Sequence, residues 1–276
     1  MREIYNTKVI GSIEQGTIIN SCVAENYCGY STYGIIVTPR CDLDNNKVST
    51  VHYLPVVRLD DWIKIDFWLI FANRAPNEVN NKLGAILDKY KLSRSLIKSF
   101  ATNILREKLK EIINKKDDFE KFDKYLSDLE TLNKPFNEIS KPEIKQIVED
   151  YNKVSKDIFK DLKDNKRKEF YLLENWDSNA EYYVVLLREI RKITFQLANK
   201  ISHGIYEHQI TASEWESNDI SKNYNEENFI YSIATLRSPH IEHLIQQFFW
   251  NFGRIGVENH PSDIETQFHN RIANII

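Results

Sequence analysis

The chain has 276 residues, enough to bury a sizeable core as one large domain or two. It contains no run of about 18 apolar residues, and its first ten residues, MREIYNTKVI, lack the apolar core of a signal peptide, so we expect a cytoplasmic protein without a membrane span. The net charge of −3 is uneven: residues 76–168 hold 22 Lys and Arg against 17 Asp and Glu, a net +5, and the remainder carries −8. An acidic remainder argues against non-specific binding to nucleic acid, which depends on neutralising phosphates.

The N-terminal third of the chain has the pattern of a β-meander. Residues 7–20 predict an opening strand pair, punctuated by Gly11 and Gly16. Residues 34–38 form an apolar strand that Pro39 should end, because proline cannot donate a ladder hydrogen bond. The segment CDLDNNK at 41–47 predicts a turn, and alternation over 49–57 predicts a third strand.

The middle of the chain changes to the helical period at about Pro76. Apolar residues recur there at spacings of three and four. A second helix is expected over 117–132, and Pro142 in a first-turn position predicts a third over 141–163. Residues 76–168 are therefore predicted to be a helical insertion whose many charges form a solvated face.

Strand patterns return at Phe170. Strands are predicted over 170–176, 182–192 and 229–236, with a short helix over 196–204 that Gly204 ends and a polar loop over 211–228. A last helix is predicted over 238–253, with Ser238 as N-cap and Pro239 at the first position. Its apolar stripe, which should be buried, is made of Ile241, Leu244, Ile245, Phe248, Phe249 and Phe252.

These elements predict an α+β protein with a discontinuous β-barrel. The barrel domain would comprise residues 1–75 and 169–276, including a C-terminal amphipathic helix, and the helical insertion 76–168 would interrupt it. Strands on the two sides of the insertion should then pair in one sheet.

With the insertion removed, five segments follow one another: GSIEQGTII, GIIVTPRCDL, VHYLPVV, FYLLENWDSNAEYYVVLLREIRKIT and QLANKISHG. This order resembles the SH3-like barrel of the MazF/PemK-type toxins. That family shows a G-D-I-V opening strand, then strands of the kinds P-A-V-V-L-S, V-A-P-I-T and V-V-L-L-D-Q-I-R-T-I-D. The segment YYVVLLREIRKIT matches best, and the resemblance covers roughly residues 1–60 and 169–204. It implies an SH3-like fold and a toxin-antitoxin or antiphage context.

The catalytic residues of that family are not matched. The family cleaves RNA with an Arg before the second strand and a Ser or Thr after the third, whereas here Tyr33 precedes Gly34 and the third strand runs into Val57 and Arg58. A rearranged site would use Arg40, Asp42 and Arg58, since an Arg stabilises phosphate charge and a carboxylate moves a proton. The alternative is that Cys41 is buried, Asp42 and Asp44 cap the turn, and Arg40 pairs locally.

Other candidate residues carry weaker signals. A Cys₃His zinc site has four weak candidates, Cys22, Cys28, Cys41 and His52. They are weak because their spacing lacks a C-x₂₋₄-C knuckle. His240 and His243 lie three apart on the last helix, without the i, i+4 geometry of a zinc helix, and His203 is placed to interact with the last carbonyls of its helix. We expect no bound metal and no cofactor.

Two functional hypotheses follow. The first is a toxin-like or phage-defence component that acts mainly by binding a protein partner, and the second is an endoribonuclease with a site around Arg40, Asp42 and Arg58, for which RNA would be the partner. A structural adaptor unrelated to toxins is a third possibility.

Overall fold

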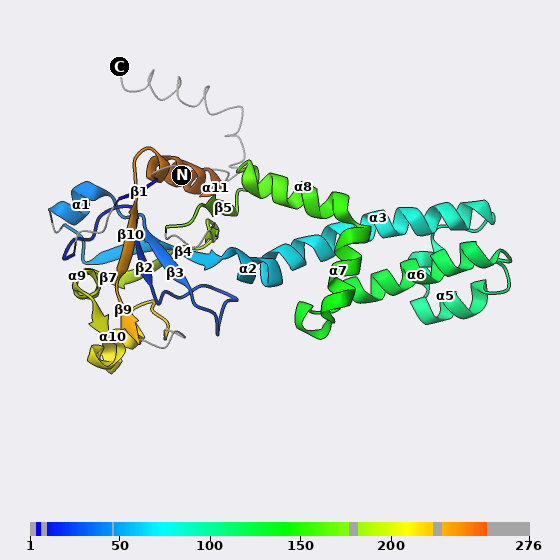
Figure 1. Cartoon of the computed structure of the whole chain (residues 1–276), viewed down its shortest axis with the longest axis horizontal. Coiled ribbons are helices and arrows are strands. Elements are labelled where there is room, and N and C mark those ends of the chain that lie inside the picture. The colour runs from blue at the N-terminus through cyan, green and yellow to red at the C-terminus, as the bar shows by residue number, and fades with distance from the viewer. Residues whose placement is uncertain (1–3, 7–9, 46, 177–181, 223–227, 253–276) are drawn as a thin grey trace, which may run out of the picture.

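The protein is an α+β structure built on a curled antiparallel sheet, seen in a computed structural model that describes residues 4–6, 10–45, 47–176, 182–222 and 228–252 (Figure 1). The strands of this sheet are β1 (Tyr5–Asn6), β2 (Thr17–Asn20), β3 (Tyr33–Ile36), β4 (Thr50–Arg58), β5 (Phe170–Leu173), β6 (Tyr183–Leu186), β7 (Arg191–Thr194) and β10 (Ser232–Leu236). Their order is β1-β10-β2-β3-β4-β6-β5, and β7 also pairs with β4. Strands β8 (Ile205–Tyr206) and β9 (Phe229–Ile230) form a separate pair.

The long strand β4 lies at the centre of the sheet and joins the two halves of the chain. It pairs with β3 on one side and, on the other, with β6 through Val56 and Val185 and with β7 through His52 and Lys192. Its apolar residues are buried, as in a strand covered on both faces. The prediction that strands on both sides of residues 76–168 pair in one sheet is therefore confirmed.

One strand prediction is tested in part and another is wrong in detail. Residues 10–20 contain one strand, β2, whose neighbours are β3 and β10, and β1 pairs with the other side of β10; residues 7–9, where the first strand of the predicted opening pair would lie, are outside the described residues. The strand predicted over 182–192 is two strands, β6 and β7, separated by a turn. In this turn Arg188 pairs with the buried Asp66, and Glu189, itself buried, accepts a hydrogen bond from the amide of Glu25, so polar contacts interrupt an otherwise strand-like pattern.

The segment predicted as a turn after Pro39 is a short helix, α1 (Arg40–Asp44). The amide of Leu43 donates to the carbonyl of Pro39, and the Leu43 side chain is buried in the core. The residues of this segment are compatible with either an open turn or a helical turn. The helical turn is the one that buries the Leu43 side chain.

The middle of the chain forms a helical arm that projects from the sheet (Figure 1). It begins with α2 (Leu59–Trp62), one π-helical turn η1 (Ile63–Phe67) and α3 (Trp68–Lys89), so Pro76 lies inside a helix that starts at the end of β4. The rest of the arm consists of α4 (Leu96–Ser99), α5 (Thr102–Leu109), α6 (Lys116–Leu132), η2 (Phe136–Glu138), α7 (Lys141–Asp150) and α8 (Asn152–Lys163).

The helix predicted over 117–132 is confirmed as α6, but the one predicted over 141–163 is broken into α7 and α8. The break lies at Tyr151, whose ring is buried and whose hydroxyl donates to Asp128 Oδ2 at 2.6 Å. A continuous helical period across residues 141–163 could not indicate this tertiary contact.

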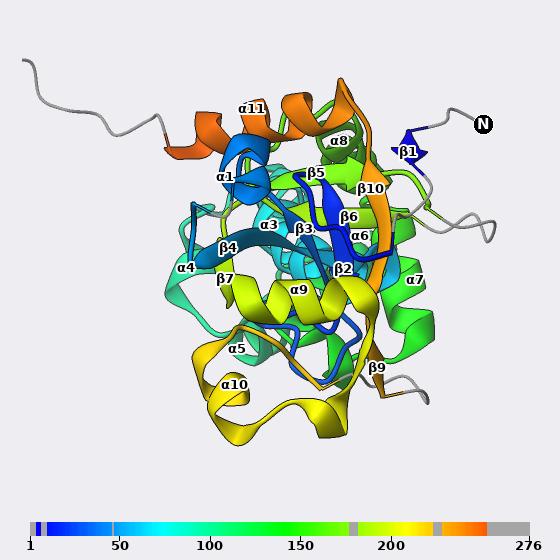
Figure 2. The same cartoon turned by 90° about the vertical axis from the view of Figure 1, so that its left-hand side faces the viewer.

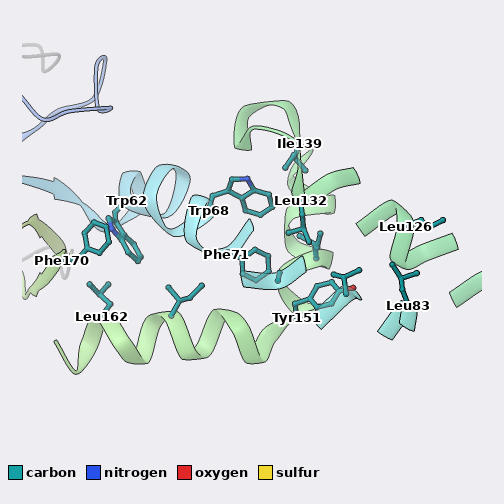
Figure 3. Packing of buried hydrophobic residues seen from close by; sticks show 14 of the residues in the cluster. Trp62, Trp68, Phe71, Leu83, Leu126, Leu132, Ile139, Tyr151, Leu162 and Phe170 are labelled. Atoms are coloured by element: carbon teal, nitrogen blue, oxygen red, sulfur yellow. The ribbon is translucent and has the colours of Figure 1, made fainter. Parts of the chain in front are cut away.

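The arm and the sheet share one hydrophobic core. Trp62 and Phe170 lie edge to face with their ring centroids 5.4 Å apart, and Leu162 of α8 lies beside them (Figure 3). The same cluster continues through Trp68 and Phe71 into the middle of the arm.

Two more helices lie on opposite sides of the sheet, α9 (Phe195–His203) and α11 (His240–Phe252) (Figure 2). Helix α9 ends at Gly204, where φ is +83°, and a Cβ added there would meet the Phe229 ring. The predicted helix and its glycine stop are therefore confirmed. The stretch predicted as a loop over 211–228 contains α10 (Ala212–Ser217), preceded by η3 (Glu207–Gln209). A capping box between Thr211 and Glu214 opens α10, and this local signal was readable in the sequence.

Helix α11 buries Ile241, Leu244 and Phe248 against the sheet. Phe249, predicted to belong to the same buried stripe, is 63% exposed. Only the part of the stripe that faces the sheet is covered, and Gly253, expected to end the helix, lies outside the described residues.

Candidate functional site

The structure does not gather Arg40, Asp42 and Arg58 into one site. Helix α1 lies near the start of β4, where the amide of Val37 donates to the carbonyl of His52, and Arg58 is the last residue of β4. At about 3.3 Å per strand residue, Arg58 lies roughly 20 Å beyond His52. Figure 1 shows α1 and α2 at the two ends of β4, so the three residues cannot act on one phosphate.

The four weak zinc candidates are also apart. Cys22 is buried in the core beside Tyr53, whereas His52, the adjacent residue of β4, is exposed and points to the other face of the strand. Cys28 and Cys41 are exposed in a loop and in α1. Within the described ranges no cluster of three or more His, Cys, Asp or Glu side chains is suited to a metal ion. His203 Nδ1 lies 2.9 Å from the carbonyl of Asn199, the local contact expected at the end of a helix.

This placement predicts the reactivity of the thiols. Burial raises the pKa of the Cys22 thiol well above its usual value, so little thiolate forms and no reagent reaches it. We expect iodoacetamide at pH 8 to label Cys28 and Cys41 in the native protein and all three cysteines after denaturation, as counted by mass spectrometry. Rapid native labelling of Cys22 would contradict the packing described for it.

A concave surface lies between β5, the end of α8 and the start of α11. It begins as a hollow of about 600 Å³ and continues into a second hollow of about 650 Å³ on α8. Phe159 and Lys163 line both, so the two form one continuous surface, which we call the β5 groove. In Figures 1 and 2, β5 lies beside α11 and the end of α8.

Polar side chains from two elements meet at the α11 side of this groove. Tyr171 of β5 and His243 of α11 share a hydrogen bond of 3.0 Å between the phenol oxygen and Nδ1, and His240 lines the same hollow. Burial raises the pKa of Tyr171, which keeps the phenol protonated. The groove therefore offers hydrogen-bonding groups that are held in place by the packing of α11 on the sheet.

The α8 side of the groove is basic. Lys153, Lys156, Lys160 and Lys163 are spaced three, four and three residues apart, so they share one face of the helix. All four are exposed, and none forms an ion pair within the part of the chain that the structure describes. Between them Phe159 is 48% exposed, as is Tyr182 across the groove. The surface thus combines lysines that form no ion pair in the described residues with accessible aromatic rings, while Asp164 and Glu174 add two carboxylates to its lining.

The sequence does not predict this groove. It offers His240 and His243 only as a pair three residues apart that lacks the geometry of a zinc helix, and no pattern in it singles out Tyr171 or Lys163. Lys163, Tyr171 and His243 come from three elements, and no spacing or motif links them. The sequence does show the run of lysines in α8, but the same pattern is typical of a solvated helix face and does not indicate a groove.

A second cluster of charges lies where the arm meets the sheet. Arg188 Nη1 and Nη2 donate to the two carboxylate oxygens of Asp66 at 2.7 and 3.1 Å, and the hydroxyl of Tyr27 donates to Asp66 Oδ2 at 2.6 Å. Asp66 is only 4% exposed and lies in the π-helical turn η1. Arg188 and Tyr27 both donate to Asp66, so the network joins three separate segments of the chain. We therefore assign it a structural role at the junction of the arm and the sheet.

Comparisons with known proteins give no relative: no protein-family model, no curated protein and no solved structure matches the chain. Within the described residues, we find no helix with the length and apolar character needed to cross a membrane.

Proposed function

We propose that the protein is a toxin-like or phage-defence component that acts mainly by binding a protein partner, and that the β5 groove is the surface it uses. The observation that carries the binding role is the basic and aromatic surface of the groove. The toxin or defence context rests on the MazF/PemK-like sequence pattern. An SH3-like barrel of that type is part of the proposal and is supported by a curled antiparallel sheet that contains the matched segments.

The chemistry of the groove favours a protein segment with acidic side chains. Aromatic residues are enriched in protein interfaces, and the side chains of Phe159 and Tyr182 are both exposed in the groove. Lys156, Lys160 and Lys163 would complement Asp or Glu on the partner, which speeds association and selects among partners. Arg40, Asp42 and Arg58 are too far apart to support the endoribonuclease hypothesis.

A defined probe tests this proposal without knowledge of the natural partner. A labelled peptide of about ten residues with alternating valine and glutamate should bind the protein, as measured by fluorescence anisotropy. We expect Lys160→Glu combined with Lys163→Glu to weaken binding about tenfold or more, since attraction becomes repulsion. Lys145→Glu is the control, because Lys145 lies on α7 and does not line the groove.

Two outcomes would overturn the proposal. The first is equal binding of a matched peptide with lysine in place of glutamate. The second is cleavage of labelled single-stranded RNA by the purified protein that is lost with Arg40→Ala, which would restore the endoribonuclease hypothesis.

A further inference from the structure

Strand β5 is an edge of the sheet, and its free side forms part of the groove. Among the strands of the described residues it pairs only with β6, with Tyr171 opposite Val185 and Leu172 opposite Val184. The amide of Leu187 donates to the carbonyl of Glu169, in the same register. Since antiparallel pairs alternate between hydrogen-bonded and non-hydrogen-bonded residues, Tyr171 bonds toward β6 and the backbone N–H and C=O of Leu172 point away from it.

These outward groups of Leu172 open onto the groove. Leu172 lines the hollow of about 600 Å³, and its outward N–H and C=O have no hydrogen-bond partner in the described part of the chain. An edge strand with unpaired backbone groups is a template on which another strand can pair.

The opposite wall of the hollow belongs to the other edge of the sheet. Ile4, which precedes β1, and Leu236, which pairs with Tyr5 of β1, both line it. The hydroxyl of Tyr5 donates to the carbonyl of Glu174, just beyond β5. The curl of the sheet therefore brings its first and last strands to a common seam.

We infer that the groove receives an extended acidic segment of the partner by strand addition to β5. The added strand would take up the outward N–H and C=O of Leu172 and extend the sheet toward β1. This inference rests on the proposed function and specifies its binding mode.

The surroundings of the seam determine which side chains the segment needs. Successive residues of a strand point to opposite faces, and the two helices cover opposite faces of β5: α8 packs in the same cluster as Phe170, and α11 in the same cluster as Tyr171. One alternate set of the added strand would face the end of α8, where acidic residues complement Lys163. The other set would face α11 and Leu236 and can be apolar. The predicted recognition pattern is acidic and apolar residues in strict alternation.

The test removes a single backbone donor. Leu172→Pro deletes the outward N–H, and a proline is tolerated in an edge strand whose N–H faces away from its partner. Leu172→Ala is the matched control, because it loses the side chain and keeps the N–H. We expect the valine–glutamate peptide to bind Leu172→Ala within about twofold of the unmodified protein and Leu172→Pro at least about tenfold more weakly. Circular dichroism and the melting temperature check that both variants are folded.

Two further measurements do not depend on the proline variant. N-methylation of alternate amides in the peptide should weaken binding by a similar factor for one of the two alternate sets only. Hydrogen exchange at the Leu172 amide should be fast in the free protein and slow with the peptide bound.

The outcomes separate the two proposals. Binding that is sensitive to the Lys160 and Lys163 changes but insensitive to Leu172→Pro and to N-methylation would overturn strand addition and leave the groove as the partner site. Failure of the peptide to bind would overturn both. A Leu172 amide already protected in the free protein would also overturn the inference, because the edge would then be covered by the chain itself.

Discussion

Arg188→Ala should destabilise the protein by about 3–5 kcal/mol, because it leaves the buried carboxylate of Asp66 without its cation. Asp66 receives two hydrogen bonds from Arg188 and one from Tyr27, and it is 4% exposed. Burial, and then the neighbouring Asp66, raise the pKa of Tyr27, so its phenol stays neutral and still donates a hydrogen bond to Asp66 but supplies no positive charge. Urea denaturation monitored by tryptophan fluorescence should show the loss as a lower midpoint.

Two controls isolate the buried charge as the cause. Arg94 also donates to a carboxylate, Asp88, but that pair is solvent-exposed, and Arg94→Ala should leave the midpoint nearly unchanged. Combining Arg188→Ala with Asp66→Asn should cost less than Arg188→Ala alone, since no buried charge remains unpaired. A double variant as unstable as the sum of the two single variants would contradict this explanation.

Phe248→Ala should also cost about 3–5 kcal/mol, as expected for a large-to-small change in a packed core. Phe248 is 8% exposed and packs with Ile241 and Leu244 against the sheet. For a chain of this size the melting temperature should fall by roughly 6–20 °C in differential scanning calorimetry. The adjacent Phe249 is 63% exposed, so Phe249→Ala is a control of identical chemistry on the same helix and should change stability by less than about 0.5 kcal/mol.

The comparison distinguishes a core helix from a docking helix. If Phe248→Ala left the melting temperature unchanged and abolished association with a partner, the apolar stripe of α11 would be a binding face, and α11 would not be held by the sheet.

Features with a local cause were predictable from the sequence. The apolar alternation of β4, the helical period of α6 and the glycine that ends α9 each lie within one short stretch, and each appears in the structure. The change of period along the chain also indicated a helical segment between strands of one sheet. These patterns record which face of an element is buried, and burial of apolar surface is the dominant favourable contribution to folding.

Features that depend on a distant partner were decided only by the tertiary structure. The arm begins at Leu59 and not near Pro76, the predicted helix over 141–163 breaks where Tyr151 reaches Asp128, and β6 ends where Arg188 turns toward Asp66. The β5 groove has the same origin, because His243 meets Tyr171 only after α11 has packed on the sheet. A periodic sequence specifies that a face must be covered, but it does not specify which segment covers it or which polar groups are brought together.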